Sequence, residues 1–318
     1  MSYRWGCQAI LRRLSLKALR WSGLEPISSV QGILRGPNED VGLSNFPTIA
    51  FIGGGNMAKA IIGGLLESGC PGHNISVVVP TQATRRTLNT MGIEQVSSSP
   101  GSREFDADIL VLAVKPQKLA TALPPLQGKL SGDTTVLSVI AGVTSDTLAQ
   151  LLGISDIGQI VRCMPNTPSL IGHGVTGVYA ADATDTVTVG MICEMLEAIG
   201  DVFWLDSEDD LDVITAISGS GPAYFFLFME SLSAAGVSMG FSEEVARKLA
   251  VQTALGAGRL AEESPESLAQ LRRNVTSPGG TTEQAINAFL QGGLPELVAA
   301  AANASKQRSI EISKELAS

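Results

Sequence analysis

The chain has 318 residues, which suggests about two domains. Apolar residues make up 44% of it and charged residues 17%, a balance that excludes an intrinsically disordered chain. A formal net charge of -9 argues against nucleic acid as the main partner. No uninterrupted apolar run approaches the length of a membrane-spanning helix, so we expect no membrane segment.

Residues 1–46 differ in composition from the rest of the chain. They carry six basic residues against three acidic ones, and the first 24 residues contain no acid at all. An Arg-rich, acid-free, amphipathic start is typical of a mitochondrial transit peptide. A flexible extension, or a translation start assigned too far upstream, would give the same composition, so these alternatives stay open. We exclude residues 1–46 from the predicted fold.

The cysteines and histidines do not have metal-binding spacing. The four cysteines form no Cys-x-x-Cys pair, and the chain has two histidines, His73 and His173. We therefore expect no metal site. Widely spaced thiols in a chain of this size are typical of reduced, intracellular proteins. This favours a cytoplasmic location, or a mitochondrial one if residues 1–46 are a transit peptide.

From residue 47 onward, predicted strands alternate with predicted helices. Apolar and β-branched runs predict strands at residues 48–52, 75–79, 108–114, 135–140, 159–162, 175–179 and 202–205. Apolar spacings of three and four predict helices at residues 56–68, 85–91 and 187–199. Such alternation implies right-handed crossovers between strands. We therefore expect an α/β domain with a mostly parallel, doubly wound sheet over residues 47–208.

After residue 208 the predicted strands stop. Helical periodicity covers residues 210–239, 242–262, 268–274, 281–290 and 295–316. We therefore predict an all-α domain over residues 209–318. Its long apolar helices form a core first, but they can also bury a face against a second copy of the chain.

A glycine cluster links the first predicted strand to the first predicted helix. Residues 53–58 fit the pattern G-x-G-x-x-A in the strand–turn–helix context that this dinucleotide-binding fingerprint requires. In that reading Gly53 permits the tight turn, and Gly55 lets the backbone approach a pyrophosphate. Ala58 keeps helix and strand close, and the helix N-terminus offers N–H groups to the anion. A tight turn without a ligand is the alternative.

The end of the second predicted strand bears on the choice of nicotinamide cofactor. Enzymes that use NAD commonly place an Asp or Glu there, against the ribose hydroxyl. Residues 78–86 contain no acid but offer the Thr81 hydroxyl and the guanidinium groups of Arg85 and Arg86. This favours NADPH over NADH. The alternative is that both arginines lie on a solvated helix face.

Three further loops carry candidate ligand contacts. The loops at residues 113–117 and 138–143 follow later strands, and small residues at Ala141 and Gly142 leave room for a nicotinamide ring. In the helical half, residues 275–284 form a Gly-rich loop that runs into a helix. Thr281 with Gln284 fits a capping box. The loop N–H groups there form a site for a small carboxylate.

Taken in order, these motifs resemble those of the pyrroline-5-carboxylate reductase family. The resemblance rests on residues 52–58, 113–116, 141–143, 162–168, 218–224 and 277–282. It covers about residues 48–316. The resemblance implies a Rossmann-type domain followed by a helical dimerisation domain. It also implies hydride transfer from NAD(P)H to the imine carbon of 1-pyrroline-5-carboxylate, giving L-proline in the last step of proline biosynthesis.

The resemblance also implies a set of cofactor contacts. Asn56 and Met57 would donate backbone N–H groups to the pyrophosphate, and Asn274 would contact the cofactor from the helical domain. The full set of expected cofactor-binding residues is Ile52, Gly53, Gly54, Gly55, Asn56, Met57, Thr81, Ala113, Val114, Lys115, Pro116, Ala141 and Asn274. The chain departs from the family at Val79, where Ser, Thr or Asn is usual. That departure weakens the case for NADPH.

The substrate contacts follow from the same resemblance. Glu208 would meet the substrate ring, and Thr282 is the expected catalytic residue, with its hydroxyl nearest the imine nitrogen. The expected substrate-binding residues are Glu208, Ser277, Gly279, Gly280, Thr281 and Thr282. The family also implies a homodimer, assembled further into a ring such as a decamer. Its active site lies between the Rossmann domain of one subunit and the helical domain of its partner.

Two other functions remain as alternatives. A 3-hydroxyacid or 6-phosphogluconate-type dehydrogenase shares this domain order, but it would need a Lys-x-x-x-Asn pattern after residues 218–222, which the chain lacks. A non-catalytic NADP-binding sensor would need no Thr-rich loop at residues 277–282.

Overall fold

The structure, a computed structural model, describes residues 46–181 and 184–317, so the predicted extension lies outside it except for Phe46. The described chain forms two compact units. The first runs to Gly219 and resumes at Gln307, and the second is Ser220–Lys306. This division differs from the domain boundary predicted after residue 208. Residues 209–219 and the end of the last helix pack with the sheet.

Eight strands form one sheet in the first unit. They are β1 (Ile49–Ile52), β2 (Ile75–Val78), β3 (Gln95–Ser97), β4 (Ile109–Leu112), β5 (Thr135–Ser138), β6 (Ile160–Met164), β7 (Gly174–Ala180) and β8 (Gly200–Trp204). Their spatial order is β3-β2-β1-β4-β5-β6-β7-β8. Every neighbouring pair is parallel except β6 with β7. The predicted mostly parallel, doubly wound sheet is confirmed.

The direction of strand addition reverses between β1 and β4. Strands β1 to β3 extend toward one edge of the sheet and β4 to β6 toward the other, which is the Rossmann-type order. Ligands of such sheets bind beyond the carboxyl ends of the strands at this reversal. Because Ile52 and Leu112 are register partners, the loops that start at Gly53 and Ala113 leave the sheet side by side.

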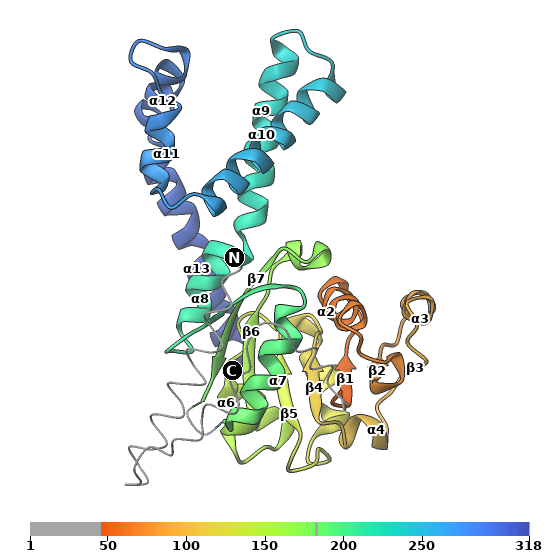
Figure 1. The fold of residues 1–318 in the computed structure, drawn as a ribbon. Coiled ribbons are helices and arrows are strands. Elements are labelled where there is room, and N and C mark those ends of the chain that lie inside the picture. The colour runs from red at the N-terminus through yellow and green to blue at the C-terminus, as the bar shows by residue number, and fades with distance from the viewer. Residues whose placement is uncertain (1–45, 182–183, 318) are drawn as a thin grey trace, which may run out of the picture. The chain divides into compact units, whose positions relative to one another are not determined.

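Helices cover both faces of this sheet (Figure 1). They are α2 (Asn56–Glu67), α3 (Gln82–Thr90), α4 (Ser102–Phe105), α5 (Leu119–Ala122), α6 (Ser145–Leu152), α7 (Thr186–Glu197) and α8 (Asp210–Ile214). Side chains of β1 alternate between two cores. Ile49 and Phe51 pack with α2 and α7, whereas Ala50 and Ile52 pack with α5 and α6. Each fully buried large apolar side chain contributes about 1.5–3 kcal/mol, so both faces stabilise the sheet.

The sequence pattern missed several short elements. Strand β3 has three residues and is only partly buried, so it lacks a clear apolar run. Helix α6 is marked by its cap, in which the Thr144 side chain accepts a hydrogen bond from the Thr147 N–H. That cap follows a strand-end loop directly, and the periodic part of the helix is short. Short elements of this kind are fixed by the sheet they pack on rather than by local sequence.

The second unit is helical. It contains α9 (Gly221–Ser238), α10 (Glu243–Glu263), α11 (Leu268–Asn274), α12 (Thr281–Gln291) and most of α13 (Leu294–Ala317). Ser242 and Ser267 accept hydrogen bonds from backbone N–H groups at the starts of α10 and α11. The predicted all-α character of this region is confirmed.

The single helix predicted at residues 210–239 is broken. Helix α8 passes into a π-helical turn, Thr215–Gly219, and α9 begins after it. Pro222 has no N–H group and cannot continue an α-helical ladder, and the glycines beside it lower helix propensity. The apolar periodicity continues through the break, which is why the sequence alone predicted one helix.

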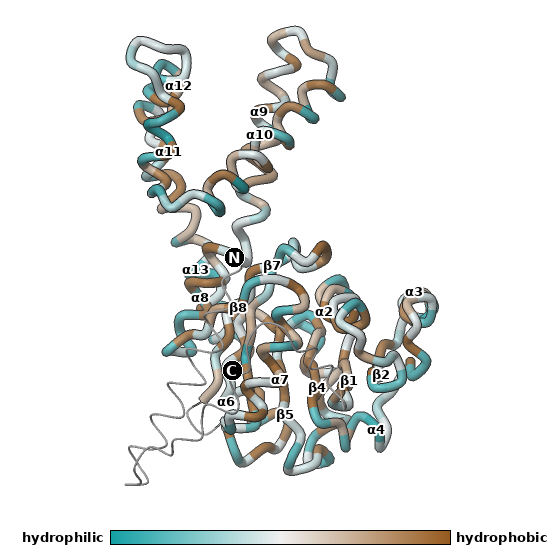
Figure 2. Tube along the Cα trace, in the orientation of Figure 1, coloured by the Kyte–Doolittle hydropathy of each residue, from teal (hydrophilic) through white to brown (hydrophobic). Residues whose placement is uncertain are grey.

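Helix α9 leaves large apolar side chains exposed. Phe225, Phe226 and Leu227 are each at least 60% exposed in one copy of the chain. By length and composition alone, Asp210–Ser238 could cross a membrane, although its uninterrupted apolar run at residues 223–229 is far shorter than a membrane span. Figure 2 shows hydrophobic residues in the strands of the sheet as well as in this helix. An exposed apolar helix face is equally what a subunit interface requires.

Candidate active site

The loop after β1 is built by three glycines with different constraints. Gly53 has φ +107°, and a Cβ atom there would lie 2.4 Å from the carbonyl oxygen of Ala113. At Gly54, a Cβ atom would lie 3.0 Å from Cγ2 of Thr84. Gly55 has nothing within 4 Å of its Cβ position. The first two glycines therefore pack against the protein, and the third faces open space where a ligand can approach the backbone.

The N-terminus of α2 offers hydrogen-bond donors beside that open space. Gly55 is the residue before the helix and, as a glycine, has no side chain to cap it, and the first turn holds no acidic residue. The first N–H groups of a helix have no partner within the helix, so those of Asn56 and Met57 can serve an anion. The loop therefore fits a dinucleotide pyrophosphate by shape and by charge.

The loop between β2 and α3 has fewer free donors than the sequence suggested. Val79 is 7% exposed and packs in the core, so it does not face a ligand. One guanidinium nitrogen of Arg85, Nη1, donates to the carbonyl oxygens of Val79 at 2.9 Å and of Pro80 at 2.6 Å. Arg85 is therefore not a purely solvated side chain, and its Nη1 is already bound to the loop rather than available to a phosphate. Thr81, just before α3, and Arg86, at the middle of α3, are both exposed.

The loops after β4 and β5 lie next to each other because their strands pair. The Ala113 N–H donates to the carbonyl of Ile52, which fixes the start of the β4 loop beside β1. Lys115 is exposed, and Pro116 follows it in a short 3-10 turn. Gly142, next to Ala141, has φ +71°, and a Cβ atom there would lie 2.8 Å from Cγ2 of Ile312 in α13. The end of α13 therefore packs against the β5 loop.

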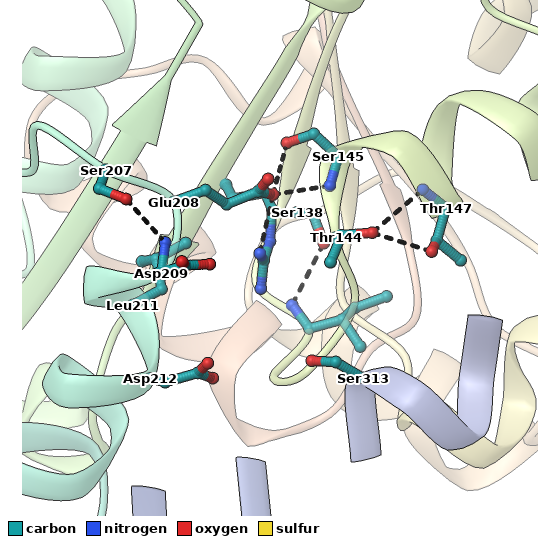
Figure 3. A network of polar contacts seen from close by, with 12 residues as sticks. Ser138, Thr144, Ser145, Thr147, Ser207, Glu208, Asp209, Leu211, Asp212 and Ser313 are labelled. Atoms are coloured by element: carbon teal, nitrogen blue, oxygen red, sulfur yellow. Dashed lines mark hydrogen bonds and ion pairs between the residues drawn. The ribbon is translucent and has the colours of Figure 1, made fainter. Parts of the chain in front are cut away.

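Glu208 lies at the centre of a polar network in the first unit (Figure 3). Its Oε1 accepts hydrogen bonds from the Ser145 N–H at 2.7 Å, from the Ser145 hydroxyl at 2.8 Å and from Nη1 of Arg162 at 2.8 Å. Ser145 is the first residue of α6, and Arg162 lies on β6. The network therefore joins the β5–α6 loop, strand β6 and the segment before α8.

The charge state of Glu208 follows from these contacts. Burial raises the pKa of Glu208, but the hydrogen bonds from Arg162 and Ser145 and the positive charge of Arg162 together bring that pKa below its ordinary value. The Arg162 side chain is 8% exposed and that of Glu208 is 25% exposed. At neutral pH the site therefore holds a fixed carboxylate whose second oxygen, Oε2, takes part in none of these three bonds.

The Gly-rich loop of the second unit leads into α12. The predicted capping box of Thr281 with Gln284 is wrong, because Gly280 is the residue before the helix and Thr281 already lies within it. Instead, Oε2 of Glu283 accepts a hydrogen bond from the Gly279 N–H at 2.8 Å. Gly279 has φ +72°, which favours glycine at that position. The carboxylate of Glu283 thus binds one of the loop N–H groups that the sequence assigned to a ligand.

The predicted substrate residues of this loop are accessible. Ser277, Thr281 and Thr282 are all exposed. Asn274, at the end of α11, accepts a hydrogen bond from Gln270 and donates one to Glu266. All of these residues belong to the second unit, whereas Glu208 and the nucleotide loop belong to the first.

Neither histidine side chain takes part in the contacts described above. His73 lies in the short turn before β2 and His173 just before β7, and both are exposed. Over residues 46–181 and 184–317, no group of three or more His, Cys, Asp or Glu residues could hold a metal ion.

Sequence reasoning missed Arg162 and Ser145 as partners of Glu208. The available signal was an arginine inside an otherwise apolar strand, which requires a buried counter-charge.

Comparison with known proteins identifies the family. Residues 208–312 match the family described as pyrroline-5-carboxylate reductase dimerisation, and residues 48–142 match NADP oxidoreductase, coenzyme F420-dependent. The chain is 42% identical to pyrroline-5-carboxylate reductase of Pseudomonas aeruginosa over 85% of this chain and 98% of that one. It is 33% identical to the enzyme of Pisum sativum, over 85% of this chain and 98% of the relative.

Solved structures agree with these relatives. A pyrroline-5-carboxylate reductase from Coxiella burnetii has a TM-score of 0.76 at 38% identity, covering 85% of this chain and 99% of that one. A pyrroline carboxylate reductase from Plasmodium falciparum, solved with NADP bound, has a TM-score of 0.73 at 28% identity, covering 84% and 98%. The match spans both the nucleotide loop and the helical unit. The chain therefore belongs to the pyrroline-5-carboxylate reductase family.

Proposed function

We propose that this chain reduces 1-pyrroline-5-carboxylate to L-proline by transfer of a hydride from NADPH to the imine carbon. The observation that carries this proposal is the open nucleotide loop at Gly55. It lies in a chain that is 42% identical to a named reductase over 98% of that enzyme's length. Hydroxyacid dehydrogenase and NADP-sensor functions are not favoured by these relatives.

The first unit supplies the cofactor contacts in this proposal. Gly53 and Gly54 shape the turn, and the open backbone at Gly55 with the N–H groups of Asn56 and Met57 holds the pyrophosphate, with Ile52 ending the strand beneath it. The loop of Ala113, Val114, Lys115 and Pro116, together with Ala141, lines the nicotinamide side. In the proposed dimer, Asn274 contacts the cofactor from the helical unit of the second copy. Bound NADPH supplies the hydride. Strands β1, β4 and β5, which pair directly, hold the first-unit loops at one edge of the sheet.

The substrate contacts combine a carboxylate site with a nitrogen contact. The loop of Ser277, Gly279, Gly280 and Thr281 holds the substrate carboxylate, which displaces Glu283 from the Gly279 N–H. The Thr282 hydroxyl donates a hydrogen bond to the nitrogen of the neutral imine, and once that nitrogen is protonated the Thr282 oxygen accepts its N–H. Glu208 carries a fixed negative charge, which favours the protonated form of an imine near it. A protonated imine accepts hydride more readily, so no general base is needed.

The cofactor preference rests on the β2–α3 loop. The missing acid and the exposed hydroxyl of Thr81 favour NADPH, and a family member has been solved with NADP bound. Arg85 keeps two guanidinium nitrogens beyond the one that binds the loop carbonyls, so it can still contact a phosphate. NADH is the alternative cofactor, and its affinity and turnover should be measured beside those of NADPH.

The match of residues 208–312 to a dimerisation family supports a homodimer through the helical unit. We further propose that these dimers assemble into a larger ring such as a decamer. An open groove between α9 and α10 is lined by apolar side chains that include Phe226, Met229 and Val237. We place the protein in the cytoplasm, with the mitochondrion as the alternative if residues 1–46 are a transit peptide. Mass spectrometry of the native N-terminus decides between these two.

One assay separates the candidate functions. NADPH oxidation is followed with pyrroline-5-carboxylate and with no second substrate, and NADP⁺ reduction is followed with a 3-hydroxyacid. The proposal expects turnover only with pyrroline-5-carboxylate and L-proline as the product. Turnover of the hydroxyacid, or cofactor binding without any turnover, contradicts it.

A further inference from the structure

The motif at residues 162–168 has no role in the function proposed above. It includes the end of β6 and the start of the turn after it, and it contains both Arg162 and Asn166. These two residues are four positions apart. Each of them contacts one end of the same distant segment, which runs from Glu208 to Gly219 and contains α8 and the π-helical turn.

Arg162 holds the first end of this segment. Its Nη1 donates to Oε1 of Glu208 at 2.8 Å, and its side chain is 8% exposed. Its Nε atom is also buried and has no hydrogen-bond partner. A buried arginine with an incomplete set of partners is costly to the fold unless its one ion pair is kept. The pair therefore fixes where Glu208 begins the segment.

Asn166 holds the other end through the carbonyl of Ser218. In a continuous α-helix that carbonyl would accept the N–H of residue 222, but residue 222 is proline and has no N–H. The Asn166 Nδ2 donates to the Ser218 carbonyl at 3.0 Å. The other side of the same amide, Oδ1, accepts the Val175 N–H at 2.9 Å. Asn166 is 7% exposed, and these two bonds fix its orientation.

The segment also packs closely on neighbouring strands, both at Gly219 and at Ile214. A Cβ atom at Gly219 would lie 2.8 Å from Cε of Met164, which lies between Arg162 and Asn166 in the chain. A Cβ atom at Gly177 on β7 would lie 2.7 Å from Cγ1 of Ile214 in α8. The segment thus packs on β6 and β7, and hydrogen bonds from Arg162 and Asn166 fix its two ends.

We infer that Arg162 and Asn166 are positioning residues that fix the segment from Glu208 to Gly219 at its two ends, and that Asn166 supplies the hydrogen bond that Pro222 cannot. The inference rests on the proposed function for one consequence only. Because Glu208 is the expected substrate contact, releasing Ser218 at the far end of the segment should impair catalysis without any change at Glu208 itself.

A double-mutant cycle tests the link between Asn166 and Pro222. Asn166→Ala leaves the Ser218 carbonyl without its donor, and Pro222→Ala restores a backbone N–H that can reach that carbonyl. We expect Asn166→Ala to raise the unfolding equilibrium constant by about thirtyfold or more, because the Ser218 carbonyl and the Val175 N–H both lose their partner. In the Pro222→Ala background the same substitution should cost clearly less. The Val175 N–H is left unpaired in both backgrounds, so its contribution cancels.

The matched control replaces another proline in the first turn of a helix. Pro295 is the second residue of α13, as Pro222 is of α9. Asn166→Ala and Pro295→Ala should be additive. Additivity of Asn166→Ala with Pro222→Ala, or equal coupling with both prolines, overturns the inference.

A kinetic reading of the same variants tests positioning rather than stability. At a temperature where all variants are fully folded by circular dichroism, Asn166→Ala should lower kcat/KM for pyrroline-5-carboxylate by about tenfold. NADPH affinity, measured by fluorescence, should stay unchanged, and Pro222→Ala should restore part of kcat/KM. An unchanged kcat/KM overturns the positioning role. If the wild-type chain does not reduce pyrroline-5-carboxylate, the proposed function fails, and the stability cycle still decides whether Asn166 and Pro222 are linked.

Discussion

The ion pair between Arg162 and Glu208 makes a prediction about how stability varies with pH. Arg162→Met removes the charged donor and leaves Glu208 with its two bonds from Ser145. Breaking a buried pair by removing one partner costs about 3–5 kcal/mol. Two features of this site reduce that figure, because the Glu208 side chain is 25% exposed and the lost arginine has an unpaired Nε. We expect a loss of about 2 kcal/mol, or about 4–8 °C in Tm.

The direction of the pH dependence follows from the pKa of Glu208. In the wild-type chain that pKa is lower when folded than when unfolded. The carboxylate therefore stabilises the fold above its unfolded pKa, and this contribution is lost as the pH falls through the folded value. Without Arg162, burial still raises the pKa of Glu208 and fewer contacts oppose it. The Tm difference between wild type and Arg162→Met should therefore be largest near neutral pH and should shrink as the pH falls below the ordinary carboxyl value of about 4.

Calorimetry of both proteins at several pH values measures this difference directly. The control is Arg308→Met, which removes an exposed arginine that also binds two carboxylates, Glu311 and Glu315. Exposed pairs contribute little to stability, so this control should show almost no dependence of the Tm difference on pH. A Tm difference for Arg162→Met that is the same at acidic and neutral pH would refute the electrostatic reading of the network.

The remaining predictions concern cofactor, substrate and assembly. Gly55→Asp should abolish NADPH binding with little change in Tm, because its Cβ position has no protein atom within 4 Å. Gly53→Ala should destabilise the fold as well, because Gly53 has φ +107° and the added Cβ atom would lie 2.4 Å from the Ala113 carbonyl oxygen. Calorimetric titration and Tm together separate these cases, and unchanged affinity in Gly55→Asp argues against the cofactor site. Thr282→Ala should lower kcat/KM by about 10–100-fold, whereas Thr282→Ser should keep most of the activity. NADPH affinity should be unchanged in both variants. Normal turnover by the Ala variant would mean that Thr282 has no role in catalysis. Sedimentation should find a dimer or a larger species, and a fully active monomer contradicts the proposed assembly.

Local sequence determined most of the sheet and the nucleotide loop. The run at β1 and the glycines after it lie within one continuous stretch, so the turn and the helix start are encoded by neighbouring residues. The same holds for the helices of the second unit, whose apolar periodicity extends over many turns. Where several motifs of one family occur in order, the family is also readable from the sequence.

Tertiary structure alone decided the parts that depend on distant partners. The sequence predicted an unbroken helix through residues 215–219, because the apolar pattern does not change there. The break depends on Pro222 and on the side-chain amide of Asn166, which lies 52 residues before Ser218 in the chain. The partners of Glu208 lie 46 and 63 residues before it, on a strand and on a helix start. The capping group of the α12 loop also differed, because Glu283 reaches back to Gly279. Hydrogen bonds between side chains and distant backbone depend on how the elements pack, and no local pattern of residues encodes that packing.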